Sequence, residues 1–97
     1  MLYAIFARDV PESFALRHKL RPAHLSRLRS MRDEGRLVLA GPHPTSDAPD
    51  SSGFTGSLIV AEFESLVAAQ AWTEADPFKQ GGVYAEVTVL PFTKVLP

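Results

Sequence analysis

A histidine occupies an apolar position in the segment RPAHLSRLRSM, which runs from Arg21 to Met31. On a helix of 3.6 residues per turn, His24 lies between Leu20 and Leu28 on one stripe of side chains. An imidazole that faces inward can form a hydrogen bond within the core, or it can be the working group of a site. A core histidine bonded to a nearby carbonyl is the commoner case, so the position alone favours a structural role.

The chemistry available to His24 depends on where its helix begins. If Pro22 occupies the first helical position, His24 lies in the first turn, near the positive end of the helix dipole. That field disfavours the imidazolium, so a neutral imidazole able to accept a proton would prevail near pH 7. This start of the helix therefore predicts a general base at His24.

Asp76 is the second candidate, because a carboxylate at the end of a helix needs compensation. It follows Trp72 by four residues and lies at the negative end of a helix expected over residues 66–75. One sufficient explanation is that aspartate before proline often makes a turn. The other is a partner that is cationic or donates a hydrogen bond, and His24 is eligible. Such a pair would fix the ring tautomer and stabilise the protonated ring.

Weaker signals come from residues that could hold a substrate or a metal. Ser57, at the start of an expected strand, could supply a hydroxyl group, although most such serines only begin strands. Arg21 could hold an anionic substrate, although a solvated arginine is commoner. His43, Asp47 and Asp50 could bind a metal only if their loop folded around it, and their spacing matches no common ligand pattern. We predict Ser57 and Arg21 as substrate-binding residues and no metal site.

Composition fits one domain spanning residues 1–97, with 45% hydrophobic and 22% charged residues. The net charge of −1 does not favour nucleic acid as a partner, because phosphate binding needs a basic surface. The absence of cysteine suits a reducing cytoplasm. No apolar run is long enough to span a bilayer, and no familiar cofactor motif is present. We expect a soluble cytoplasmic protein with no membrane partner and no cofactor.

The candidate residues are carried by four expected strands and by two or three expected helices. We expect strands over 2–8, 36–41, 57–63 and 83–92, and helices over 11–20, 22–34 and 66–75, with a long loop over 41–56. One helix that kinks at Pro22 is the alternative to two separate helices before residue 35. Strand, helix, strand, strand, helix and strand in this order predict an α+β fold. In it, a four-stranded antiparallel sheet carries the helices on one face, as in the ferredoxin-like βαββαβ arrangement.

Both faces of the expected sheet are apolar. In the first strand Tyr3 and Ile5 point to one face, and Ala4 and Phe6 point to the other. The helices can cover only one face, which leaves an apolar patch on the order of several hundred Å². The simplest cover is the same face of a second copy, so we predict a two-fold homodimer through the sheet.

Four segments together resemble the YCII-related (YciI-like) family. They are MLYAIFARD, RPAHLSRLRSMRDEGRLVLAGP, GFTGSLIVAEFESLVAAQAWTEADPF and GVYAEVTVLPF, which cover most of the chain. The family's markers are a histidine in the first long helix, GP after the second strand and DP followed by an aromatic residue after the second helix. They stand here as His24, Gly41-Pro42 and Asp76-Pro77-Phe78.

The resemblance implies a ferredoxin-like domain that dimerises through its sheet, the dimeric α+β barrel, with an active site on His24 and Asp76. Proteins of that superfamily include lyases, isomerases and monooxygenases that act on lactones, chlorinated aromatics and similar compounds. We therefore expect a cofactor-independent acid–base enzyme of the lyase or isomerase type, acting on a small cyclic or aromatic molecule. The alternative is a non-catalytic module that binds a small metabolite or another protein, in which His24 only donates a hydrogen bond.

Overall fold

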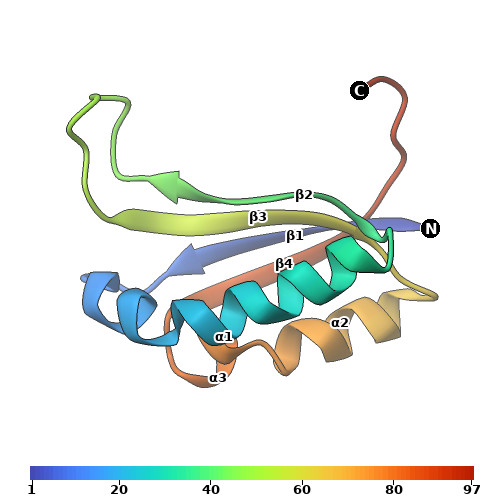
Figure 1. Cartoon of the computed structure of the whole chain (residues 1–97), viewed down its shortest axis with the longest axis horizontal. Coiled ribbons are helices and arrows are strands. Elements are labelled where there is room, and N and C mark those ends of the chain that lie inside the picture. Colours follow the sequence, from blue (N-terminus) through green and yellow to red (C-terminus); the bar gives the residue numbers. More distant parts are fainter.

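The computed structural model describes residues 1–97, and its four strands all run antiparallel to their neighbours in one sheet. The elements are β1 (Leu2–Asp9), α1 (Phe14–Asp33), β2 (Leu37–Pro44), β3 (Phe54–Glu62), α2 (Leu66–Glu74), α3 (Pro77–Gln80) and β4 (Tyr84–Phe92). The strand order is β2-β3-β1-β4, and the helices lie on one face of the sheet (Figure 1). The predicted ferredoxin-like α+β arrangement is confirmed. None of the helices combines the length and apolar character needed to cross a membrane.

The first helix is continuous, so the prediction that a new helix begins at Pro22 is wrong. α1 starts at Phe14 and carries Pro22 in its interior. A proline inside a helix removes the hydrogen bond to the carbonyl four residues earlier, here that of His18. His18 is exposed, so solvent can satisfy its carbonyl. His24 therefore lies well inside α1, beyond the first turn to which the dipole effect is confined.

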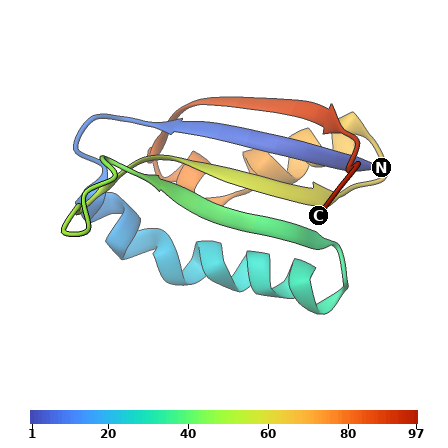
Figure 2. The ribbon, with the colours of Figure 1, turned by 90° about the horizontal axis from the view of Figure 1, so that it is seen from above.

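The β2–β3 hairpin is longer than expected. β2 continues to Pro44 and β3 begins at Phe54, so the loop spans residues 45–53 rather than 41–56. Prolines fit here because β2 is an edge strand, where a missing backbone N–H need not break the ladder. The register sets Pro42 opposite Ser57. Seen from above, β2 and β4 form the two edges of the sheet (Figure 2), and the tip of the hairpin bends away from the helices (Figure 1).

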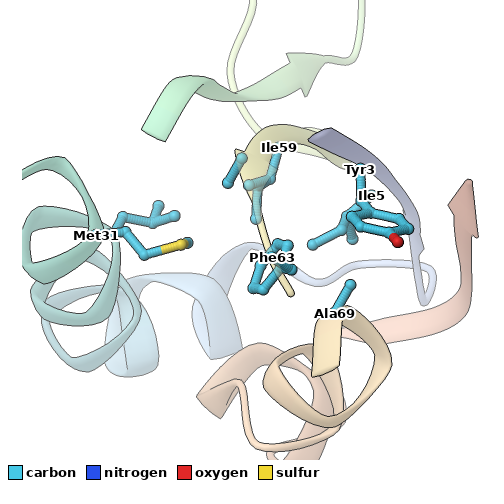
Figure 3. Close-up of a cluster of buried hydrophobic side chains, with 8 residues drawn as sticks. Tyr3, Ile5, Met31, Ile59, Phe63 and Ala69 are labelled. Carbon is cyan, nitrogen blue, oxygen red and sulfur yellow. The ribbon is translucent and has the colours of Figure 1, made fainter. Parts of the chain in front are cut away.

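The main core fills the space between the sheet and the helices (Figure 3). Its buried members are Tyr3, Ile5, Leu28, Met31, Ile59, Ala61, Phe63 and Ala69. α2 is fixed at its start by the Ser65 hydroxyl, which accepts a hydrogen bond from the Ala68 N–H at 3.1 Å. A second, smaller cluster contains Ala7, Phe78, Val83 and Tyr84, and it holds α3 against β4. The first cluster supports the sheet, and the second supports the candidate site.

The opposite face of the sheet carries no helix and is also apolar, as predicted. Large hydrophobic side chains there remain accessible: Phe6 at 45%, Leu39 at 48%, Leu90 at 49% and Phe92 at 42%. Phe6 lies opposite Leu58 of β3, and Leu90 lies opposite Ala4 of β1. Apolar side chains thus extend across all four strands on this open face.

Candidate active site

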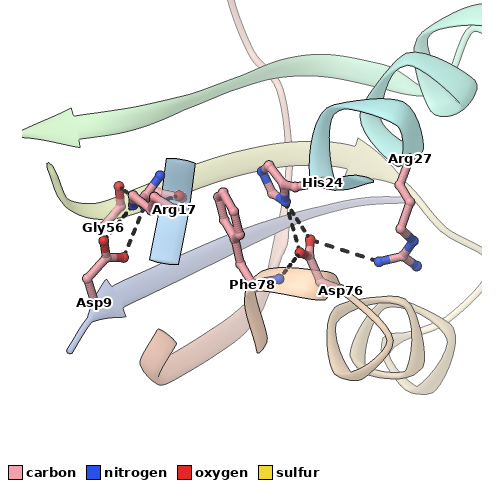
Figure 4. A network of polar contacts seen from close by, with 8 residues as sticks. Asp9, Arg17, His24, Arg27, Gly56, Asp76 and Phe78 are labelled. Carbon is pink, nitrogen blue, oxygen red and sulfur yellow. Dashed lines mark hydrogen bonds and ion pairs between the residues drawn. The ribbon is translucent and has the colours of Figure 1, made fainter. Parts of the chain in front are cut away.

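α1 and the junction between α2 and α3 bring His24 and Asp76 together (Figure 4). The Nδ1 atom of His24 lies 2.9 Å from Oδ1 and 3.0 Å from Oδ2 of Asp76. Both side chains are buried, with residue exposures of 6% and 1% respectively. The two predicted residues therefore form a close pair, although the middle of α1, and not its start, supplies the histidine.

Asp76 lies at the end of one helix and the start of the next. Ala75 is the C-cap of α2, and Asp76 is the N-cap of α3, where its Oδ1 accepts a hydrogen bond from the Phe78 N–H at 2.8 Å. Arg27 Nη1 lies 3.9 Å from Oδ2. Both compensations considered for this carboxylate are present, because it caps the turn at Pro77 and also has His24 as a hydrogen-bond partner and Arg27 as a cationic neighbour.

Arg27 is held beside Asp76 by an aromatic ring. Its guanidinium carbon lies 4.3 Å from the centre of the Trp72 ring. Burial lowers the pKa of Arg27, and the negative charge of Asp76 opposes that shift. Arg27 is thus a further cationic neighbour of the His24–Asp76 pair.

Phe78 separates the pair from a second buried ion pair. The His24 and Phe78 rings are stacked, with centres 4.0 Å apart and planes 12° apart. The Arg17 guanidinium carbon lies 4.9 Å from the centre of the same phenyl ring. Arg17 and His24 are seven residues apart, so they lie on one face of α1. Figure 4 shows the Phe78 ring between them.

Sequence reasoning missed Arg17 and Asp9, which form this second pair. Arg17 Nε bonds Asp9 Oδ2, and its Nη2 donates to Asp9 Oδ1 at 3.0 Å, to the Gly56 carbonyl at 2.9 Å and to Ser57 Oγ at 2.8 Å. Ser13 Oγ also donates to Asp9 at 2.6 Å. The available signal was the helical spacing, which places Arg17 on the stripe of His24. Several other basic residues lie between Arg17 and Arg32, and such a cluster is typical of a solvated helix face. Arg17 was therefore not distinguished from its exposed neighbours.

A cavity of about 270 Å³ lies between α1 and the β2–β3 part of the sheet. Three of the four predicted site residues line it, namely His24, Ser57 and Arg21, whereas Asp76 lies behind His24. Ser57 is buried and Arg21 is exposed. Three phenyl rings also border the cavity: those of Phe14, Phe54 and Phe78. The cavity is therefore lined by aromatic rings together with polar side chains from α1 and β3.

The second nitrogen of His24 is free to act. Nδ1 faces a carboxylate that accepts hydrogen bonds, which favours a proton on Nδ1 and a lone pair on Nε2. The buried side-chain N and O atoms that lack a partner are Arg27 Nη1 and Tyr84 Oη. His24 Nε2 makes no hydrogen bond and is not one of them, so it is accessible, and the cavity is the space that the ring borders. The arrangement can accept a proton from a bound molecule.

No cluster of three or more His, Cys, Asp or Glu side chains is positioned to hold a metal ion. His43 lies on β2, and Asp47 and Asp50 lie in the exposed loop that follows it.

Comparison with known proteins identifies the family. The model of the YCII-related domain matches residues 1–93. The chain belongs to the YCII-related family. Protein YciI of Escherichia coli O6:H1 is 56% identical over 97 residues, covering 98% of this chain and 99% of that protein. An uncharacterized protein of Haemophilus influenzae is 47% identical with the same coverage. The family predicted from the markers is confirmed.

Among solved structures, this YCII-related chain is similar to the 5-chloro-2-hydroxyhydroquinone dehydrochlorinase TftG from Burkholderia phenoliruptrix AC1100, in complex with 2,5-dihydroxybenzoquinone. The TM-score is 0.84 at 29% sequence identity, with 96% of this chain and 94% of that chain covered. The predicted fold class, that of the dimeric α+β barrels, is confirmed.

Tyr84, at the start of β4, supports the site through Phe78 without lining the cavity. Its ring packs edge-on against Phe78, with centres 5.7 Å apart. Burial raises the pKa of the Tyr84 phenol to about 12; the neighbouring Ser57 hydroxyl and Arg17 oppose the shift, and the charges of Asp76 and Asp9 add to it. The phenol oxygen is buried and has no hydrogen-bond partner of good geometry. The fold therefore favours the neutral phenol.

We expect Tyr84 to make the stability of the protein fall at alkaline pH. A phenol whose pKa is raised from about 10 to about 12 on folding stabilises the native state fully below pH 10, and this contribution is lost as the pH rises towards 12. The loss should be roughly 2–3 kcal/mol, and Tyr84→Phe should not show it. The measurement is urea unfolding of both proteins from pH 8 to 12. Free energies of unfolding that stay parallel for the two proteins over this range would contradict it.

Proposed function

We propose that the protein is a cofactor-independent acid–base enzyme of the lyase or isomerase type that acts on a small cyclic or aromatic molecule. The observation that carries the proposal is the buried contact between His24 Nδ1 and Asp76, at 2.9 Å, with the other ring nitrogen free at a cavity. A carboxylate in this position orients the ring and stabilises the imidazolium that forms when the ring takes a proton.

In the proposed reaction, His24 Nε2 removes a proton from a carbon atom beside a carbonyl group. The electron pair of the C–H bond forms a carbon–carbon double bond, and the carbonyl π pair moves to oxygen. The imidazolium then returns the proton to a different carbon, which gives an isomer, or the enolate expels a leaving group together with its bonding pair, which gives elimination. Both outcomes need acid–base groups in a fixed geometry.

The cavity and the comparison support a small ring as substrate. A volume of about 270 Å³ suits a compact molecule, and the walls include the rings of Phe54 and Phe78. The similar structure is that of a dehydrochlorinase with a hydroxylated quinone bound. Ser57 in the cavity wall and Arg21 at its exposed edge are the proposed positioning groups.

Deuterium exchange tests the proposal before the natural substrate is identified. The panel consists of enolisable cyclic ketones and chlorinated hydroxyhydroquinones in D₂O. We expect the protein to incorporate solvent deuterium into at least one of them, and proton NMR measures the loss of the proton signal. His24→Gln should slow this exchange by roughly 100-fold or more, because glutamine can still donate to Asp76 but cannot accept the proton.

His43→Gln is the matched control, since His43 is exposed on β2, and it should exchange at the wild-type rate. Exchange that survives in His24→Gln would contradict the role of the base. If panel members bind, as shown by thermal shift, but never exchange, the non-catalytic binding module becomes the better explanation.

The active form is proposed to be a homodimer joined through the open face of the sheet. Four large hydrophobic side chains on that face, among them Phe6 and Leu90, are between 42% and 49% exposed. A two-fold contact between identical faces would cover them and leave the helices and the cavity outside the contact.

Light scattering at micromolar concentration should give twice the mass of one chain. Phe6→Lys should give the mass of one chain, because a charge would be placed in the centre of the contact. Val67→Lys is the control, since Val67 on α2 is 72% exposed and away from the sheet, and it should remain dimeric. A monomeric wild-type protein would refute the dimer.

A further inference from the structure

We infer that the cavity is built to bind a negatively charged ring oxygen, and that Arg17 and Ser57 are the groups that hold it. The inference rests on the proposed function, because the ring would be the substrate that His24 deprotonates. It adds a substrate class: planar rings that carry an acidic hydroxyl group or a carbonyl group that becomes an enolate.

The polar lining of the cavity consists of groups that can donate hydrogen bonds. Apart from His24, whose Nε2 is the proposed base, they are Arg17, His18, Arg21 and Ser57, and no acidic residue lines the cavity. The two nearby carboxylates, Asp9 and Asp76, lie behind Arg17 and His24 and are bonded to them. A ligand in the cavity therefore meets donors and positive charge, which favours an anion.

Arg17 has one donor nitrogen to spare. It is only 6% exposed, and its Nε and Nη2 atoms are used by Asp9, Gly56 and Ser57. No protein group accepts a hydrogen bond from Nη1, yet Nη1 is not one of the two buried atoms without a partner. It is therefore accessible, and the cavity is the space that Arg17 lines.

The Asp9 clamp makes this donor rigid. Two bonds to one carboxylate fix the plane of the guanidinium, so Nη1 is oriented before any ligand arrives. Ser57 Oγ accepts from Arg17 Nη2 at 2.8 Å, so this bond does not use its hydroxyl proton, which can be donated to a ligand or to the neighbouring Tyr84 oxygen. Arg17 Nη1 is thus a preorganised donor, and the Ser57 hydroxyl group lies beside the same guanidinium in the cavity wall.

The base and the donors are placed for one ring. His24 stacks on the Phe78 ring, and the Arg17 guanidinium lies over the same ring, with Phe78 between them. A six-membered ring in the cavity can present a carbon to His24 and an oxygen to Arg17. When Nε2 takes the proton, the electron pair of the C–H bond forms the double bond and the carbonyl pair moves onto the oxygen that Arg17 Nη1 and Ser57 stabilise.

The test compares a charged ring with a neutral ring of the same shape. The probes are 2,5-dihydroxybenzoquinone, which is anionic near neutral pH, its neutral 2,5-dimethoxy ether, and benzoate, studied by isothermal titration calorimetry at pH 7. We expect wild type to prefer the dihydroxy compound over its ether by roughly tenfold or more. Arg17→Lys should remove most of this preference and leave the affinity for the ether unchanged, because lysine retains the charge beside Asp9 but lacks the fixed fork.

Ser57→Ala provides a second variant that does not disturb Asp9, and it should weaken the dihydroxy compound alone by a smaller factor. Arg29→Lys, on an exposed position of α1, is the control and should bind as wild type does. Equal affinity of wild type for the two quinones, or no binding of either, would overturn the inference. Benzoate binding that is tighter than that of the dihydroxy compound and depends on Arg17 would overturn the assignment to a ring oxygen.

His24→Gln separates this inference from the proposed function. If the anionic ring binds in a way that depends on Arg17 but the protein never exchanges deuterium, the anion site is supported and the proposed enzymatic function is contradicted. If deuterium exchange is lost in His24→Gln but the affinity is the same for charged and neutral rings, the proposed enzymatic function is supported and the anion site is contradicted.

Discussion

The site depends on the burial of one carboxylate. Asp76 is 1% exposed, and an ionised carboxylate without partners is very unfavourable in such a place. The fold supplies the Phe78 amide at 2.8 Å, His24 Nδ1 at 2.9 Å and, at longer range, Arg27. The Phe78 amide is positioned by the start of α3, His24 by the inward side of α1, and Arg27 by its contact with the Trp72 ring. Because the two carboxylate oxygens of Asp76 face all three partners, they fix the position of the His24 ring and favour the tautomer with a proton on Nδ1.

Because α1 is continuous, it fixes the position of Arg17 relative to His24. Arg17 and His24 keep a spacing of seven residues on one unbroken helix, so both project towards Phe78. A break at Pro22 would uncouple them. The exposed position of His18 allows the helix to pass through the proline, because solvent can satisfy the carbonyl that Pro22 leaves unpaired. Two buried pairs, Asp9 with Arg17 and Asp76 with His24, are thereby held on either side of one phenyl ring.

The parts that could be predicted from the sequence are those recorded in periodicity. Apolar spacing identified the inward position of His24, and the order of elements predicted the sheet. Asp76 followed from the need to compensate a carboxylate at a helix end. Arg17 was missed because a buried arginine looks like a surface arginine until its partner, Asp9, is known to be near. Tertiary contacts also explain why a glycine is needed at position 56. A side chain there would overlap the Ala7 carbonyl of the neighbouring strand, and this close approach cannot be read from the local sequence. The extension of β2 through two prolines was also hidden, because only an edge position permits it.

The tautomer of His24 is the most direct measure of whether Asp76 sets up the base. Long-range proton–nitrogen NMR of the imidazole, at a pH where the ring is neutral, distinguishes the two nitrogens. We predict a protonated Nδ1 and an unprotonated Nε2 in the wild type, and a mixture of tautomers in Asp76→Asn. A wild-type ring that carries its proton on Nε2 would have no lone pair to offer the cavity, and this result would contradict the role of His24 as the base.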